Sequence, residues 1–121
     1  MSFNFNDDTP IYLQIAEMIK NQIISGIYKA GDKIPPIREL SAVLKANPNT
    51  VQKALNQLEE EGLITTWRTN GKFVTDNEKV ILTLKKSTVS KAVDEFFSSM
   101  KELGLTDSEI MEAIVNYKEQ K

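Results

Sequence analysis

The short distance between two predicted helices is the feature that most restricts the fold of this sequence. A helix is predicted over residues 36–45 from apolar residues at helical spacing, and Asn47-Pro48 follows it almost at once. A capping side chain before a proline is typical of a helix start. The helix that begins there has the clearest apolar periodicity of the chain, at positions i, i+3, i+4 and i+7: Val51, Ala54, Leu55 and Leu58. A connection of two or three residues forces the two helices to cross steeply, as in a helix-turn-helix.

Another helix and a hairpin are predicted on either side of this pair. A first helix is expected over about residues 10–25, because Thr9-Pro10 precedes an apolar stripe and Gly26 follows it. Residues 27–34 form a short extended stretch with a turn. Asn70-Gly71 separates two strand-like runs, which predicts a β-hairpin closed by a type I′ turn, in which both central residues have positive φ.

Two more helices are predicted in the last third of the chain. Residues 80–84 fit either a strand or the start of a long helix, and unbroken helical spacing favours the helix, although Ser87 could instead begin a new one. Thr106 and Glu109 have the spacing of a capping box and open a last helix over residues 107–118. Four residues of this last helix are predicted to face inward: Ile110, Ala113, Ile114 and Tyr117.

Composition excludes several classes of chemistry. The 121 residues include no Cys and no His, so disulfide frameworks, zinc fingers, thiol nucleophiles and histidine-based catalysis are ruled out. No apolar run is long enough to span a membrane, and the polar, acidic N-terminus is not typical of a signal peptide. We therefore expect a cytoplasmic protein that is not an enzyme and uses no metal, no cofactor and no membrane. The formal net charge of −2 neither favours nor excludes binding to nucleic acid, so the question depends on where the positive residues cluster.

The helix that begins at Asn47 has an outward face without carboxylates before Glu59. At 100° per residue, three polar side chains point away from the apolar stripe and two flank them: Asn49, Lys53 and Asn56, with Gln52 and Gln57. Asn and Gln offer a paired donor and acceptor that fit an adenine edge, and Lys fits guanine or phosphate. Asn47, Thr50 and the N–H groups of the first turn are placed to meet phosphate.

A second group of polar and positive residues lies at the predicted hairpin tip, where Thr69 and Asn70 stand between Arg68 and Lys72. Such a tip can reach a flanking groove or a phosphate. Arg38 adds positive charge near the start of the preceding helix. The tight helix pair, the carboxylate-free face and the basic hairpin together predict a winged helix-turn-helix that binds DNA. The alternative is a winged helix used only for protein–protein contact, without direct DNA readout.

Residues 10–74 also contain a series of short motifs. They are Pro10-Ile11-Tyr12-Leu13-Gln14-Ile15, Gly31-Asp32-Lys33-Ile34-Pro35, Ile37-Arg38-Glu39-Leu40-Ser41, Asn47-Pro48-Asn49-Thr50-Val51, Glu61-Gly62-Leu63-Ile64 and Gly71-Lys72-Phe73-Val74. With these motifs at the family's spacing, the sequence resembles the N-terminal DNA-binding domain of the GntR family of bacterial transcription regulators. The Pro-Ile-Tyr opening, the Asn-Pro-Asn-Thr turn and the short tail are most similar to the YtrA-type subfamily.

The resemblance implies DNA contacts from the second helix, from the start of the recognition helix and from the wing. Carried to this sequence, the DNA-binding residues are Arg38, Asn47, Asn49, Thr50, Gln52, Lys53, Arg68, Thr69, Asn70 and Lys72. The sequence departs from the family pattern where Pro36 stands in place of Ser and where Thr69 stands in place of the first Gly of the wing. Regulators of the YtrA-type subfamily commonly control transporter operons, so the resemblance implies a repressor with such a target.

The expected fold is mainly α with a small β-hairpin, in two segments. Residues 1–76 form the winged helix-turn-helix DNA-binding domain, and residues 77–121 form a two-helix dimerisation or effector segment. The second segment is too short to enclose a metabolite pocket of the usual size, which leaves a small-molecule effector open. Its apolar residues either cover the back of the first segment or, as the resemblance favours, form a homodimer interface: Phe96, Phe97, Met100, Ile110, Ile114 and Tyr117. A two-fold dimer places two recognition helices about 34 Å apart on a palindromic operator.

Overall fold

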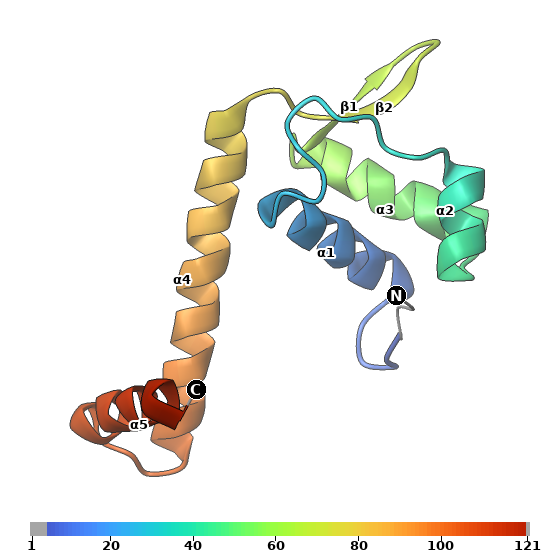
Figure 1. Ribbon diagram of the computed structural model, residues 1–121. Coiled ribbons are helices and arrows are strands. Elements are labelled where there is room, and N and C mark those ends of the chain that lie inside the picture. The colour runs from blue at the N-terminus through green and yellow to red at the C-terminus, as the bar shows by residue number, and fades with distance from the viewer. Residues whose placement is uncertain (1–4, 121) are drawn as a thin grey trace. The chain divides into compact units, whose positions relative to one another are not determined.

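A computed structural model describes residues 5–120 of the chain. Within them, five helices and one antiparallel pair of strands follow one another in the predicted order (Figure 1). The elements are α1 (Ile11–Ile24), α2 (Ile37–Leu44), α3 (Pro48–Glu60), β1 (Ile64–Trp67), β2 (Gly71–Val74), α4 (Glu78–Glu102) and α5 (Asp107–Gln120). The predicted fold class, mainly α with a small β-hairpin, is confirmed. Residues 1 and 121, the outer ends of the two expected segments, lie outside the described residues.

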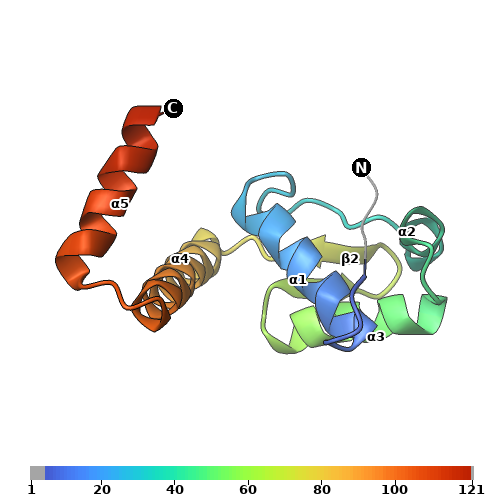
Figure 2. The same cartoon turned by 90° about the horizontal axis from the view of Figure 1, so that it is seen from below.

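Helix α3 is the centre of the first half of the chain, because α1, α2 and β1 all pack against it (Figures 1 and 2). The predicted apolar stripe of α3 is buried completely: Val51, Ala54, Leu55 and Leu58 are all 0% exposed. Ile15, Ile19 and Ile23 of α1 bury the same kind of stripe, with the i, i+4, i+8 spacing of one helix face. Burial of one side of α3 leaves its opposite side in solvent.

The turn between α2 and α3 is set by local capping. Lys45 ends α2 in the left-handed conformation, with φ of 54°. Asn47 caps α3, because its side-chain oxygen accepts a hydrogen bond of 2.8 Å from the backbone N–H of Asn49. Pro36, which stands where the resembling family has Ser, caps α2 without a side-chain hydrogen bond. The predicted tight helix-turn-helix is therefore present.

The hairpin β1–β2, here called the wing (Ile64–Val74), pairs Ile64 with Val74 and Trp67 with Gly71. The predicted type I′ turn is wrong, since Gly71 has φ of 102° but Asn70 is not among the positive-φ residues. The wing instead turns through three residues, and the Asn70 N–H donates to the Trp67 carbonyl over 3.0 Å. The positive φ at this turn falls on Gly71, the first residue of β2, and glycine adopts such a conformation without steric cost.

The predicted extended stretch before α2 lies beside the wing. The Ile34 N–H donates to the Lys72 carbonyl and the Val74 N–H donates to the Asp32 carbonyl, each over 2.8 Å. These bonds flank an isolated antiparallel bridge between Lys33 and Phe73. The base of the wing is thereby tied to the segment that leads into α2.

Helix α4 is continuous from Glu78 to Glu102, which confirms the helical interpretation of residues 80–84 over a strand or a new start at Ser87. Its first turns belong to the preceding core, because Val80, Ile81 and Leu84 pack against the buried cluster. The compact units divide between Leu84 and Lys85, inside α4, whereas the sequence placed the boundary at residues 76–77. The apolar side chains at the start of α4 account for the difference.

Helix α5 begins with the predicted capping box. The Thr106 N–H donates to the Glu109 side chain over 2.9 Å, and the Glu109 N–H donates to the Thr106 hydroxyl over 3.2 Å. Ile110 is completely buried and Ile114 is half-buried, as predicted, but Ala113 and Tyr117 are exposed on the single chain. No helix within residues 5–120 is long and apolar enough to cross a membrane.

Candidate nucleic-acid interface

The outward face of α3 is arranged as its periodicity predicts. Asn49, Lys53 and Asn56 are exposed, and Gln52 and Gln57 flank them half-buried. The buried stripe on the other side fixes this orientation, since a helix cannot rotate without exposing its apolar residues. The face carries amide and ammonium groups, the side-chain types that hydrogen-bond to base edges in a major groove.

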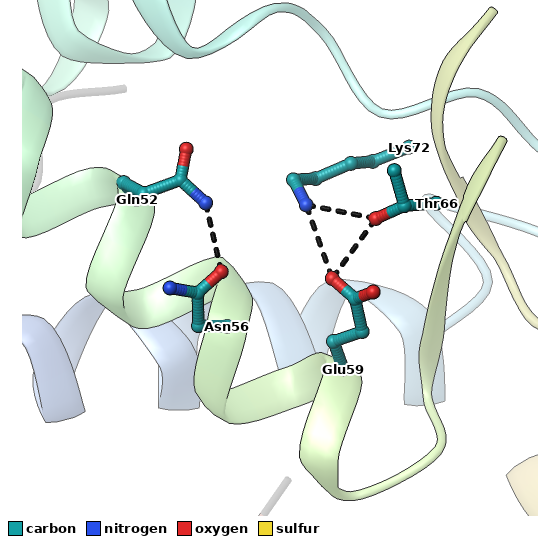
Figure 3. Close-up of polar contacts among 5 residues, drawn as sticks. All are labelled: Gln52, Asn56, Glu59, Thr66 and Lys72. Carbon is teal, nitrogen blue, oxygen red and sulfur yellow. Dashed lines mark hydrogen bonds and ion pairs between the residues drawn. The ribbon is translucent and has the colours of Figure 1, made fainter. Parts of the chain in front are cut away.

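Two amides of this face form a pair. The Gln52 side-chain N–H donates to the Asn56 side-chain oxygen over 2.7 Å, one helical turn apart (Figure 3). The pair leaves the Gln52 oxygen as an acceptor and the Asn56 nitrogen as a donor, a combination that matches an adenine edge. Asn56 was predicted on this face but was not included among the predicted DNA-binding residues. Its spacing of four residues from Gln52 is the signal that identifies it.

The start of α3 presents backbone N–H groups beside polar side chains. Asn47 uses its side-chain oxygen for the cap, so its side-chain N–H groups remain for an outside partner. Asn49 is exposed and Thr50 is half-buried on the same first turn. The positive end of the helix dipole favours an anion such as phosphate at this place.

Lys53 is held by an aromatic ring from another helix. Its ammonium nitrogen lies 4.1 Å from the centroid of the Tyr12 ring, which belongs to α1. A cation over a ring face is attracted by the ring quadrupole. Sequence reasoning assigned no role to Tyr12 beyond the family motif, and no local spacing signals it, because the contact depends on how α1 packs against α3.

Arg38 and Lys33 add positive charge beside the wing. Arg38 is exposed on the first turn of α2, as predicted. Lys33, which was not predicted, is exposed in the extended stretch. Its side chain lies against Gly71, because a Cβ added to this glycine would come within 3.3 Å of Lys33 Cε. A hollow of about 350 Å³ opens between this stretch and the wing, and its lining includes Lys33, Arg68 and Lys72. The hollow thus has several positive residues along its wall.

The predicted wing residues fall into two groups. Arg68, Thr69 and Asn70 are exposed at the tip, where the Thr69 hydroxyl donates to the Asn70 side-chain oxygen over 3.4 Å. Lys72 is set apart from them: its ammonium forms an ion pair of 3.1 Å with Glu59 at the end of α3. The structure therefore places three of the four wing residues together at the tip and directs the fourth toward the helix.

The carboxylates at the end of α3 are partly neutralised. The hydrogen bond from Lys72 lowers the pKa of Glu59, and the smaller effect of burial opposes it. Burial raises the pKa of Glu61, but hydrogen bonds from Lys20 and Gln57 and the Lys20 charge outweigh it, so the net shift is downward. Lys20 and Glu61 lie 2.9 Å apart. These pairs reduce the negative potential next to the outward face of α3.

No group of three or more acidic, His or Cys residues within residues 5–120 could hold a metal ion. The described site consists of polar and positive side chains on α2, α3 and the wing, the side-chain types that contact phosphates and base edges.

Comparison with known sequences agrees with this geometry. Residues 11–74, more than half of the chain, match the family described as bacterial regulatory proteins, gntR family. The HTH-type transcriptional regulator YhcF of Bacillus subtilis is 35% identical over 119 residues, covering 98% of this chain and 98% of YhcF. The HTH-type transcriptional repressor YtrA of the same organism is 47% identical over 83 residues, covering 69% of this chain and 64% of YtrA.

Solved structures resemble the chain as well. A GntR family transcriptional regulator from Listeria monocytogenes is 37% identical, with a TM-score of 0.87 over 93% of this chain and 98% of that one. The DNA-binding domain of AraR in complex with operator ORX1 is 28% identical, with a TM-score of 0.56 over 60% of this chain and 93% of that one. The second structure shows a domain of this fold bound to operator DNA.

Proposed function

The chain belongs to the gntR family of bacterial regulatory proteins, and on that premise we propose that it is a dimeric repressor that binds a palindromic operator. Its relatives are transcriptional regulators. The observation that carries the proposal for this chain is the outward face of α3, where amide and ammonium side chains stand opposite a fully buried stripe. In this proposal α3 enters the major groove of double-stranded DNA.

The proposal divides the predicted DNA contacts by role. Asn49, Lys53 and the Gln52–Asn56 pair read base edges, because their donors and acceptors point outward from α3. Asn47 and Thr50 meet phosphate at the positive end of the helix. Arg38 on α2 and the exposed wing tip bind the flanking backbone or groove: Arg68, Thr69 and Asn70.

The dimer is supported by apolar side chains that the single chain leaves in solvent. On α4, Val89, Val93 and Phe96 are 53%, 49% and 40% exposed and follow the i, i+4, i+7 spacing of one helix face. Of the predicted interface residues, Phe96 and Tyr117 are exposed, and Phe97, Met100 and Ile114 are half-buried. Ile110 is fully buried within the chain, so it supports the packing of α5 itself. An exposed stripe of this kind is suited to a second copy of the helix.

The mode of action and the target that we propose come from the relatives. YtrA, a relative named as a repressor, supports repression as the mode of action. The resemblance to the YtrA-type subfamily, whose members commonly control transporter operons, extends the proposal to an operon of that kind. A reporter fused to the promoter that the purified protein selects from genomic fragments would reveal repression by increased expression when the protein is absent.

The central experiment measures binding to a selected duplex as a function of salt. Neutralised phosphates release counterions, so log K is expected to fall with log salt at about −0.9 per phosphate contact. Lys53→Glu is expected to abolish binding while the free energy of unfolding falls by at most about 1 kcal/mol, because Lys53 is exposed and loses only its contact with the Tyr12 ring. Lys118→Glu, an equal change of charge on exposed α5, is the matched control. A flat salt slope, or no binding to any duplex, would instead favour a winged helix used only for protein contact.

A further inference from the structure

Three side chains form a closed polar triangle between α3 and the wing (Figure 3). The Lys72 ammonium lies 3.1 Å from a carboxylate oxygen of Glu59 and 2.9 Å from the Thr66 hydroxyl. The Thr66 hydroxyl in turn donates to the same Glu59 oxygen over 2.9 Å. Each member thus contacts both others, and the triangle joins the end of α3 to both strands of the wing.

The position of the triangle along the wing follows from strand alternation. Ile64 and Val74 form a cross-strand pair that is buried at the base of the wing, and Thr66 and Lys72 form the next pair on the same face. Beyond them, Arg68, Thr69 and Asn70 at the tip are exposed. An isolated pair of strands is marginally stable in water. The triangle gives the outer half of the wing a side-chain attachment to α3, besides the backbone hydrogen bond from Ile34 to Lys72 that joins it to the stretch before α2.

The environment of Lys72 differs from that of a free surface lysine. Its side chain is 17% exposed, and two of its three N–H donors are already directed at Glu59 and Thr66. Contact with a phosphate would pull the ammonium away from Glu59, which forms no other ion pair within residues 5–120. Arg68, in contrast, is exposed at the tip and takes part in none of the ion pairs found within residues 5–120.

We propose that Glu59, Thr66 and Lys72 act as a strut that sets the angle of the wing relative to α3, so that Lys72 serves DNA binding by positioning the tip rather than by contacting DNA. The inference rests on the proposed function, because the tip must meet DNA for its angle to matter. Glu59 and Lys72 are positioning residues in this account, and Arg68, Thr69 and Asn70 make the contact.

Removal of either end of the strut tests the proposal on the full-length protein with its selected duplex. Glu59→Ala and Lys72→Met are each expected to weaken DNA affinity about two- to fivefold, the range of a solvent-accessible ion pair. Glu60→Ala and Lys79→Met are matched controls, since both residues are exposed and lie on neighbouring parts of the chain. Thermal unfolding identifies any variant that is not folded at the temperature of the binding assay.

Two further readouts separate a strut from a DNA contact. The salt slope of Lys72→Met is expected to equal that of the wild type, because no phosphate contact is lost; a slope reduced by about one contact overturns the proposal. The exchanged pair Glu59→Lys with Lys72→Glu is expected to restore the affinity lost in the single Lys72→Glu variant. Failure of the exchange to restore any affinity overturns the proposal, as does unchanged or tighter binding by folded Glu59→Ala.

The wild type distinguishes failure of the strut from failure of the proposed function. If the wild type does not bind any duplex in a salt-dependent manner, the proposed function is wrong, and the inference about the strut is then wrong as well. If the wild type binds and every strut variant binds equally well with wild-type folding, the inference alone is wrong.

Discussion

The ammonium of Lys53 lies 4.1 Å from the centroid of the Tyr12 ring, so a residue of α1 contacts the one positively charged side chain of α3. The two residues are far apart in sequence and meet because α1 packs against α3. A lysine held over a ring loses less side-chain freedom on binding than a lysine that moves freely. Tyr12 therefore contributes to the interface without belonging to α3.

Replacement of Tyr12 is predicted to affect DNA binding according to whether a ring remains. Tyr12→Leu is expected to weaken affinity about two- to fivefold, because an exposed cation–π contact contributes about 0.5–1 kcal/mol. Tyr12→Phe keeps the ring and is expected to stay within about twofold of the wild type. Fluorescence anisotropy with a labelled duplex measures both variants. Equal losses in Leu and Phe variants that unfold like the wild type would contradict this role of the ring.

Asn47 is predicted to have separable effects on stability and on binding. Asn47→Ala is expected to lower the free energy of unfolding by about 1 kcal/mol, because the side-chain cap of Asn49 N–H is lost. Asn47→Asp keeps a capping oxygen and is expected to unfold like the wild type, yet to bind DNA more weakly because its charge repels phosphate. Urea denaturation and anisotropy, run on the same samples, check the two effects. Wild-type affinity in the Asp variant would show that Asn47 does not belong to the DNA-binding interface.

The strut is predicted to make stability depend on pH in a definite direction. The hydrogen bond from Lys72 lowers the pKa of Glu59 below its ordinary value of 4.5, so the pair stabilises the folded state above that value. This stability is lost as the pH falls through the lowered pKa. The difference in free energy of unfolding between the wild type and Glu59→Gln is expected to be at most about 1 kcal/mol at neutral pH and to vanish in acid.

Urea denaturation across the acid range measures that difference, with Glu60→Gln as the control. Glu60 is exposed and carries the same charge one residue away, so its variant is expected to differ from the wild type by a constant amount. A difference for Glu59→Gln that grows in acid would have the opposite sign and contradict the prediction.

The α4 stripe is predicted to control the oligomeric state. Val93→Glu is expected to raise the dimer dissociation constant more than about tenfold, because a buried unpaired carboxylate is costly. Val93 is 49% exposed on the single chain, so the fold itself is expected to tolerate the change. Sedimentation velocity measures the dissociation, and Lys91→Glu on the exposed polar side of α4 is the control. A wild-type chain that is monomeric at micromolar concentration would exclude this interface.

The helical features governed by neighbours within about four residues were predictable, whereas the turn type of the wing was not. The buried stripe of α3, the cap at Asn47 and the reciprocal bonds of Thr106 and Glu109 all appear in the structure as expected. Helical periodicity and capping act over one turn of the chain, so they can be read from local spacing. The outward face of α3 follows from the same rule, because it is defined as the side opposite a local stripe.

Contacts between distant residues were decided only by tertiary packing. The Asn-Gly turn signal placed Lys72 at a basic hairpin tip, but its ammonium pairs with Glu59 of α3, 13 residues earlier. The order of residues likewise did not reveal that Lys53 would lie over Tyr12, or that α4 would complete the core through Leu84. The spacing of residues along a helix or strand determines which face a side chain lies on. Its contact partner depends on which other elements pack beside that face in the folded core.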